Sequence, residues 1–190
     1  RTLDSLQSYW KRWAQNWEFQ ALLKARPCAG DQRTGEEFLR LASPFIWEAS
    51  ARDGFVDEVR SMRLQVERSV PEKNRDQELK LGVGGLRDIE FSVQFLQLVH
   101  GRNDERIRQA STLDALEALS AEGYIARSDA ASLRESYAYL RTLEHRSQLL
   151  RMHRTHNLPH SQSQIERLVR SLYGTDTSTH DLHEHLRSLR

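Results

Sequence analysis

The chain of 190 residues has little cysteine and no long apolar run, and each shortage excludes a class of protein. Its single cysteine, Cys28, cannot form an internal disulfide or a multi-cysteine metal site, which fits a reducing compartment. No apolar run approaches the roughly 18 residues that a membrane-spanning helix needs. The amino-terminus lacks the pattern of a signal peptide. We therefore expect a cytoplasmic chain.

Neither sign of charge dominates. The chain has 28 basic and 27 acidic side chains, which leaves a formal net charge of +1. This balance gives no reason to expect a nucleic acid or a membrane surface as partner. The hydrophobic content of 38% and the charged content of 29% are ordinary for a globular chain of one or two small domains.

Almost every segment has the apolar spacing of a helix, and none alternates with a period of two over a sustained length. The first helix is predicted from a stripe that Pro27 and Gly30 end, with its tryptophans in the core rather than forming a stacking platform. That stripe consists of Leu3, Leu6, Trp10, Trp13, Trp17 and Ala21. The fold class is therefore all-α, most simply an antiparallel helical bundle.

Capping residues and breakers divide the rest of the chain. Thr34 and Glu37 match a capping box that starts a short helix. Pro44 either interrupts this helix or opens the next one. Residues 71–77 are predicted to form a linker or an exposed loop. Further helices are expected over residues 55–66, 85–100, 111–123, 128–150, 161–173 and 178–189.

The run Leu79–Phe91, LKLGVGGLRDIEF, has the strongest chemical pattern. Gly82, Gly84 and Gly85 stand between Lys80 and Arg87, directly before a helix, where free amides and the helix dipole favour an anion. The alternative is a tight entry into a buried helix, because the spacing of known dinucleotide and mononucleotide loops is not met. In either case, Gly84 or Gly85 is expected to have a backbone conformation that a side chain would strain.

Polar residues on two of the predicted helices suggest a buried network. Arg87 and Glu90 lie one turn apart, as do Arg141 and Glu144, so antiparallel packing would bring all four together. Asp88 would be partly buried, either bonded to backbone amides or with a catalytic role. We predict a structural polar network of Asp88, Glu90, Arg141 and Glu144.

Two histidine-containing segments remain. Residues 141–160 contain four arginines and four histidines against one acid, which fits nucleotide phosphates, an acidic partner surface, or a solvated helix end. His180, His183 and His185 are expected to be solvated rather than to bind zinc, since only His180 and His183 share a helical face. Cys28 has no neighbouring histidine base and is not expected to be a nucleophile.

The run Lys80–Phe91 resembles a signature of the glutamine synthetase adenylyltransferase family, two-headed enzymes that attach AMP to glutamine synthetase and remove it. The related PII uridylyltransferase has a shorter version. Residues 17–27, 140–149 and 155–159 resemble the family in the same order and at similar spacing. Arg87 and the segment 144–146 look more like the first, adenylyl-removing half.

The resemblance implies that the chain is a fragment. Residues 1–50 would be the trailing helices of a nucleotidyltransferase domain, and residues 51–190 a helical bundle that links domains or binds substrate. The family's Gly-Ser-x-x-Asp-x-Asp string does not occur, so no residue here is expected to be catalytic or to bind a metal. The metal-binding carboxylates would lie upstream of Arg1, leaving the fragment inactive by itself.

Ligands and partners also follow from the resemblance. The full-length enzyme would use Mg²⁺ and ATP or ADP, and none of these ligands is expected on the fragment. The adenylyl-removing half would release AMP from glutamine synthetase by phosphorolysis. Its partners would be glutamine synthetase, the PII signal protein and a nucleotide. The phosphate contacts would be Lys24, Arg26, Lys80, Gly82, Gly84, Gly85 and Arg87. The alternative is a non-catalytic helical module that docks glutamine synthetase or PII.

Overall fold

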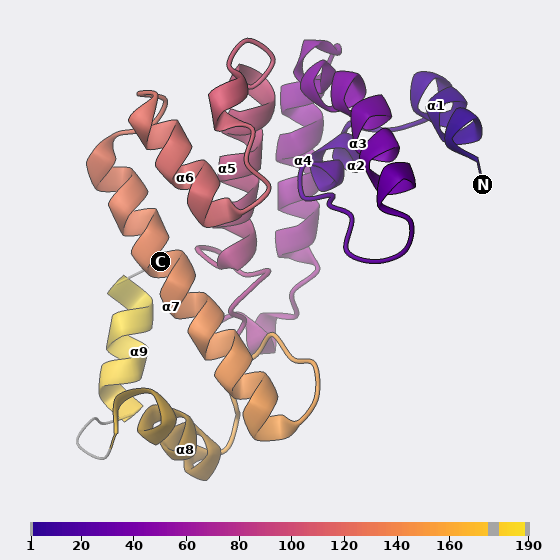
Figure 1. Ribbon diagram of the computed structural model, residues 1–190. Coiled ribbons are helices and arrows are strands. Elements are labelled where there is room, and N and C mark those ends of the chain that lie inside the picture. The colour runs from indigo at the N-terminus through magenta and orange to yellow at the C-terminus, as the bar shows by residue number, and fades with distance from the viewer. Residues whose placement is uncertain (1, 175–178, 189–190) are drawn as a thin grey trace. The chain divides into compact units, whose positions relative to one another are not determined.

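The computed structural model describes residues 2–174 and 179–188, and its regular elements there are helices, which confirms the all-α class (Figure 1). The α-helices are α1 Leu3–Arg12, α2 Asn16–Leu22, α3 Gln32–Trp47, α4 Phe55–Arg68, α5 Leu86–His100, α6 Thr112–Ala121, α7 Arg127–Arg151, α8 Gln162–Tyr173 and α9 Thr179–Ser188. Three 3-10 turns join them: η1 Ala49–Ala51, η2 Glu72–Asn74 and η3 Glu105–Ile107. In this part of the chain, no helix is long and apolar enough to cross a membrane.

The first predicted helix is wrong, because the chain forms two helices there. Gln15 starts α2, and its backbone amide donates to the Glu18 carboxylate at 2.9 Å. This cap interrupts the helix after α1 and changes the phase of the apolar stripe. Trp10 is 5% exposed, but Trp13 and Trp17 are 69% and 51% exposed, so the core position predicted for all three holds only for Trp10.

The predicted start and interruption of the third helix are also wrong. α3 begins at Gln32, and the Asp31 carboxylate caps it by accepting from the Thr34 amide at 2.9 Å. The helix continues through Pro44. The box of Thr34 and Glu37 therefore lies inside the helix, because an aspartate three residues earlier supplies the better cap.

The remaining boundaries agree with the predictions to within a few residues. α4, α5, α6, α7 and α8 occupy the expected ranges, and residues 71–77 form a mostly exposed loop around η2. The predicted start of the last helix at Ser178 and its last leucine, Leu189, lie outside the described residues.

The chain divides into two compact units, each made of two segments. Unit 1 comprises residues 1–63 and 91–130, and unit 2 comprises residues 64–90 and 131–190. The predicted division at residue 50 concerns the domains of a longer protein and stays a prediction.

Unit 1 has an aromatic core. Phe19 is 1% exposed and its ring stacks on that of Phe45, with centroids 6.2 Å apart. The buried side-chain amide of Gln20 donates to that of Gln94 at 2.9 Å, which joins α2 to α5. This bond accounts for Gln94, one of the buried polar residues of α5, since a buried amide needs a partner.

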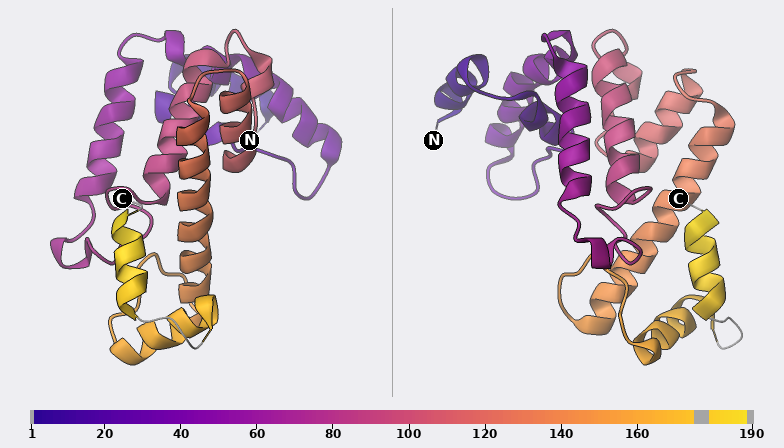
Figure 2. Two further views of the ribbon diagram at one scale, coloured as in Figure 1. Left: turned by 90° about the vertical axis from the view of Figure 1, so that its left-hand side faces the viewer. Right: turned by 180° about the vertical axis from the view of Figure 1, so that it is seen from behind.

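Unit 2 is built around the long helix α7. The helices α8 and α9 contact each other, and α9 lies beside α7 (Figure 2). The His185 ring packs edge-on against the Tyr139 ring, with the two ring centroids 4.4 Å apart. The segment after α7 pairs with residues before the glycine run, where an isolated antiparallel bridge joins Glu78 and Asn157. This pairing brings the glycine run, the start of α5 and the middle of α7 into one unit.

Candidate functional site

The glycine run forms a tight loop with two different demands on its glycines. Gly84 has a φ of +67°, a conformation that favours glycine. At Gly85, a Cβ atom would lie 2.9 Å from the carbonyl oxygens of Gly82 and Lys80, and 3.0 Å from that of Leu79. Gly84 is therefore needed for its backbone angle and Gly85 for close approach of the backbone.

The amides of this loop already have hydrogen-bond partners inside the chain. The Glu78 carboxylate accepts from the amides of Lys80 and Leu81 at 3.0 and 3.2 Å. The Asp88 carboxylate accepts from the Gly84 amide at 2.8 Å. The next three amides bond to carbonyl oxygens: Gly85 to Gly82, Leu86 to Leu79, and Arg87 to Lys80.

These bonds change the interpretation of the loop. The amides from Gly84 to Arg87, at the start of the helix, donate to the chain instead of to a phosphate, and the carboxylates of Glu78 and Asp88 lie beside the loop. Asp88 acts as the amide-bonded carboxylate of the first helical turn, one of its two predicted roles. The geometry therefore favours the tight entry into a buried helix.

The segment after α7 holds the other side of the loop. The Leu79 amide donates to the His156 carbonyl oxygen at 2.8 Å, and the Leu158 amide donates to that of Gln77 at 2.9 Å. Leu79 and Leu158 are 0% and 1% exposed. The glycine loop is thus anchored to the segment that follows α7.

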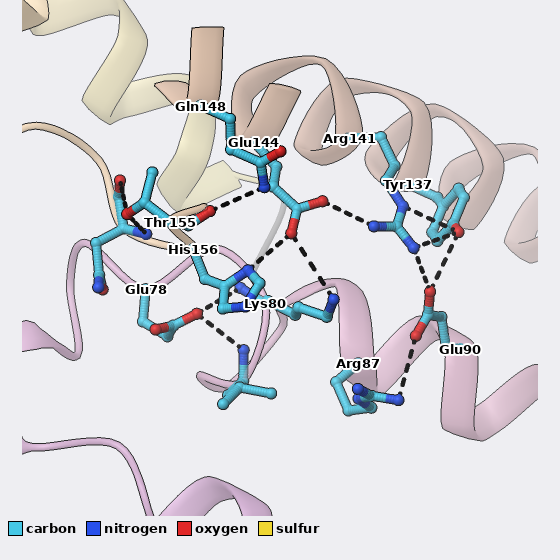
Figure 3. A network of polar contacts seen from close by, with 12 residues as sticks. Glu78, Lys80, Arg87, Glu90, Tyr137, Arg141, Glu144, Gln148, Thr155 and His156 are labelled. Carbon is cyan, nitrogen blue, oxygen red and sulfur yellow. Dashed lines mark hydrogen bonds and ion pairs between the residues drawn. The ribbon is translucent and has the colours of Figure 1, made fainter. Parts of the chain in front are cut away.

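Arg141 of α7 lies at the centre of a polar network (Figure 3). Its Nη2 atom is 2.5 Å from Glu90 Oε1, and its Nη1 atom is 2.7 Å from Glu144 Oε2. The Tyr137 hydroxyl also donates to Glu90 at 3.2 Å. Both carboxylates are nearly inaccessible, at 4% for Glu90 and 2% for Glu144. One guanidinium therefore joins the first turns of α5 to the middle of α7.

Glu144 has two further partners, a histidine ring and an ammonium group. Its Oε1 atom lies 2.9 Å from His156 Nδ1 and 3.8 Å from Lys80 Nζ. Burial acts to raise the pKa of Glu144, but the hydrogen bonds from Arg141 and His156 and the charge of Lys80 outweigh it and lower the pKa below its ordinary value. Glu144 is therefore held as a carboxylate.

Arg87 completes the network, with its Nη1 atom 3.6 Å from Glu90 Oε2. The side chains of Lys80, Arg87 and Arg141 are 16%, 33% and 28% exposed. Two guanidinium groups and one ammonium group thus lie beside two buried carboxylates. Because unpaired buried charges are strongly unfavourable, each side of this set stabilises the other.

The structure brings together most, but not all, of the residues predicted to form one site. Glu90, Arg141 and Glu144 meet as expected, whereas Asp88 caps the glycine loop. Lys24 and Arg26 belong to unit 1, where the Lys24 ammonium donates to the Thr112 hydroxyl at 2.7 Å. Tyr137, His156 and Glu78 were not predicted. The available signals were the spacing of Tyr137 one turn before Arg141 and, for His156, its place in the basic run 141–160.

The donor set does not fit a magnesium ion. Among the described residues, no three of His, Cys, Asp and Glu are grouped so that they could hold a metal. The two buried carboxylates of the network already pair with Arg141. His183 contacts the Thr179 carbonyl oxygen, and His185 contacts Tyr139.

Comparison with known proteins assigns the chain to a family. A family model described as GlnD PII-uridylyltransferase matches residues 60–189, and one described as glutamate-ammonia ligase adenylyltransferase matches residues 1–41. The chain belongs to the glutamine synthetase adenylyltransferase and PII-uridylyltransferase family. The resemblance seen in its glycine run is thereby confirmed.

Curated relatives are each named bifunctional glutamine synthetase adenylyltransferase/adenylyl-removing enzyme. One from Streptomyces avermitilis is 54% identical over 90% of the chain, and one from Nocardia farcinica is 59% identical over 84%. A relative from Corynebacterium efficiens is 50% identical over the whole chain. The chain spans 17%, 16% and 19% of these three proteins, so it is a fragment relative to them.

Proposed function

We propose that the chain is a helical, non-catalytic module of an enzyme that attaches AMP to glutamine synthetase and removes it. The names of relatives that are 50–59% identical support the activity of the longer protein. The module's part is to fix α5, α7 and the glycine loop in one arrangement. In this family member, the glycine signature is then a structural element.

The buried network is the observation that carries the non-catalytic role. Lys80 and Arg87 are the cations of the glycine signature. They pair with Glu144 and Glu90 instead of converging with unbonded loop amides on a space for an anion. An added phosphate would compete with carboxylates that are already in place and already desolvated. Lys80 and Arg87 are therefore better placed to stabilise the fold than to bind phosphate.

The chemistry of the longer enzyme would come from other segments. Mg²⁺, ATP or ADP and the carboxylates that hold the metal are assigned there, and AMP removal would use phosphate to release ADP. Glutamine synthetase is the substrate partner, as the names of the relatives indicate, and PII is proposed as a regulatory partner. We place this enzyme in the cytoplasm.

Substitutions in the full-length enzyme separate the structural role from phosphate binding. Lys80→Ala is expected to lower the free energy of unfolding by about 1–3 kcal/mol, because Glu144 loses a cationic neighbour. The kcat and the KM for phosphate and nucleotide should stay within about twofold. Arg87→Ala should behave in the same way with a smaller loss of stability. Steady-state kinetics and thermal unfolding measure both quantities.

Lys73→Ala on η2 is the control, since this exposed lysine is close in sequence but outside the network. A rise of about tenfold or more in the phosphate KM of Lys80→Ala, with unchanged stability, would show that the loop binds phosphate and would refute the proposal.

The isolated chain is expected to transfer no AMP. With Mg²⁺, nucleotide, phosphate and glutamine synthetase supplied, radiolabelled AMP should neither enter nor leave glutamine synthetase above a control without protein. Turnover by the isolated chain would place catalytic groups within these residues.

A further inference from the structure

The carboxyl-terminal end of α7 has a surface that the network does not use. We call it the basic–apolar patch, and all its side chains are exposed. It consists of His145, Arg146, Leu149, Met152, His153 and Arg154.

The apolar part of the patch is unusual for a solvated helix end. Leu149 lies in the last turn of α7 and Met152 directly follows the helix, and their exposed fractions are 64% and 86%. Met152 has a φ of +51° and is the one non-glycine residue with positive φ in the described chain. This is the position just after a helix where glycine is favoured. A large apolar side chain is therefore kept exposed where a glycine would fit the backbone better.

The basic part of the patch has no acidic counterpart close by in sequence. No Asp or Glu occurs between Glu144 and Glu166. Over residues 2–174 and 179–188, neither Arg146 nor Arg154 has an ion-pair partner. The helix dipole favours cations only within the last turn, so it accounts for Arg151 but not for Arg146 or for Arg154 beyond the helix.

We infer that the basic–apolar patch docks an acidic protein segment that carries apolar side chains. The unpaired arginines supply charge complementarity to such a segment, and Leu149 and Met152 supply apolar area that a simple anion would leave wet. A membrane surface fits less well, because membrane-bound helices present a long basic and apolar face, whereas α7 exposes Asp129 and Glu135. The inference rests on exposure and charge, and it does not depend on the proposed function.

Peptide binding to the full-length protein tests this inference. The probe is a fluorescein-labelled peptide built from glutamate and leucine, and its affinity is measured by fluorescence anisotropy. The double variant Arg146→Glu/Arg154→Glu should weaken binding by about tenfold or more, and high salt should weaken binding to the unmodified protein. Met152→Gly should weaken binding about threefold and at the same time raise the melting temperature, because glycine relieves the backbone conformation.

Matched controls separate this surface from any other exposed arginine. Val56 and Arg60 on α4 also present an exposed apolar residue and an exposed arginine one turn apart, so Arg60→Glu should leave the affinity unchanged. The inference would be overturned by no binding, by equal binding of a glutamate–serine peptide, or by binding of phosphatidylserine vesicles in preference to the peptide. Equal affinity of Met152→Gly would overturn it as well.

Discussion

Replacing Gly85 with alanine is expected to lower the free energy of unfolding by about 2–4 kcal/mol. The new Cβ atom would meet three backbone oxygens at 2.9–3.0 Å. Those oxygens accept hydrogen bonds from the amides of Gly85, Leu86 and Arg87, so they cannot move without breaking the start of α5. Urea denaturation of the chain measures the loss.

Gly123→Ala is the matched control for this prediction. Gly123 has a φ of +80° and nothing within 4 Å of a Cβ atom, so alanine there adds backbone strain without a clash. A loss of about 1 kcal/mol is expected. If Gly85→Ala costs no more than Gly123→Ala, the loop can open to admit a side chain, and the close approach seen at Gly85 is not required for folding.

The sequence predicted the polar network where the interacting residues share a helix. The pairs Arg87–Glu90 and Arg141–Glu144 follow from three-residue spacing, and the apolar stripes around them predict burial. The contact between Arg141 and Glu90 depended on two helices packing together, which the matching spacing of Arg87–Glu90 and Arg141–Glu144 suggested. Periodicity is informative here because it acts over many residues at once.

The partners from outside those helices could not be predicted. His156 reaches Glu144 only because the segment after α7 turns back and pairs with residues 77–79. The hydrogen bonds that the Glu78 carboxylate accepts from backbone amides depend on the backbone path of the loop, which its three glycines do not restrict. The break before α2 was missed for another reason: one cap, between Gln15 and Glu18, outweighs a continuous apolar stripe. Short-range caps and long-range returns of the chain both escape a periodicity argument.

Removing the central cation of the network is expected to have the largest effect. Arg141→Ala should lower the free energy of unfolding by about 3–5 kcal/mol, because Glu90 and Glu144 would stay buried without their shared partner. Chemical denaturation measures this change. The triple variant Glu90→Gln/Arg141→Met/Glu144→Gln should recover part of the loss, since neutral groups need less compensation in a buried site.

An exposed pair with the same spacing provides the control. Arg40 and Glu37 are also three residues apart, and Arg40 Nη2 lies 2.5 Å from Glu37 Oε1, but their side chains are 68% and 42% exposed. Arg40→Ala should therefore cost far less stability than Arg141→Ala. Similar losses from Arg40→Ala and Arg141→Ala would show that burial does not govern the strength of the pair formed by Arg141.

The network should also make stability depend on pH in a defined direction. The pKa of Glu144 is lowered from its ordinary value of 4.5, so the folded state binds this proton less readily than the unfolded state. Its contribution is then present above about pH 4.5 and is lost as the pH falls through the lower, folded-state pKa.

Glu144→Gln should be less stable at about pH 7 and should lose less stability on acidification. In Arg141→Ala, burial acts on Glu144 without the guanidinium, so its folded-state pKa should rise toward or above its unfolded value, and the acid-induced loss of stability should shrink or reverse. Denaturation curves across this pH range test both shifts, and parallel pH profiles for the three proteins would show that Glu144 does not titrate with folding.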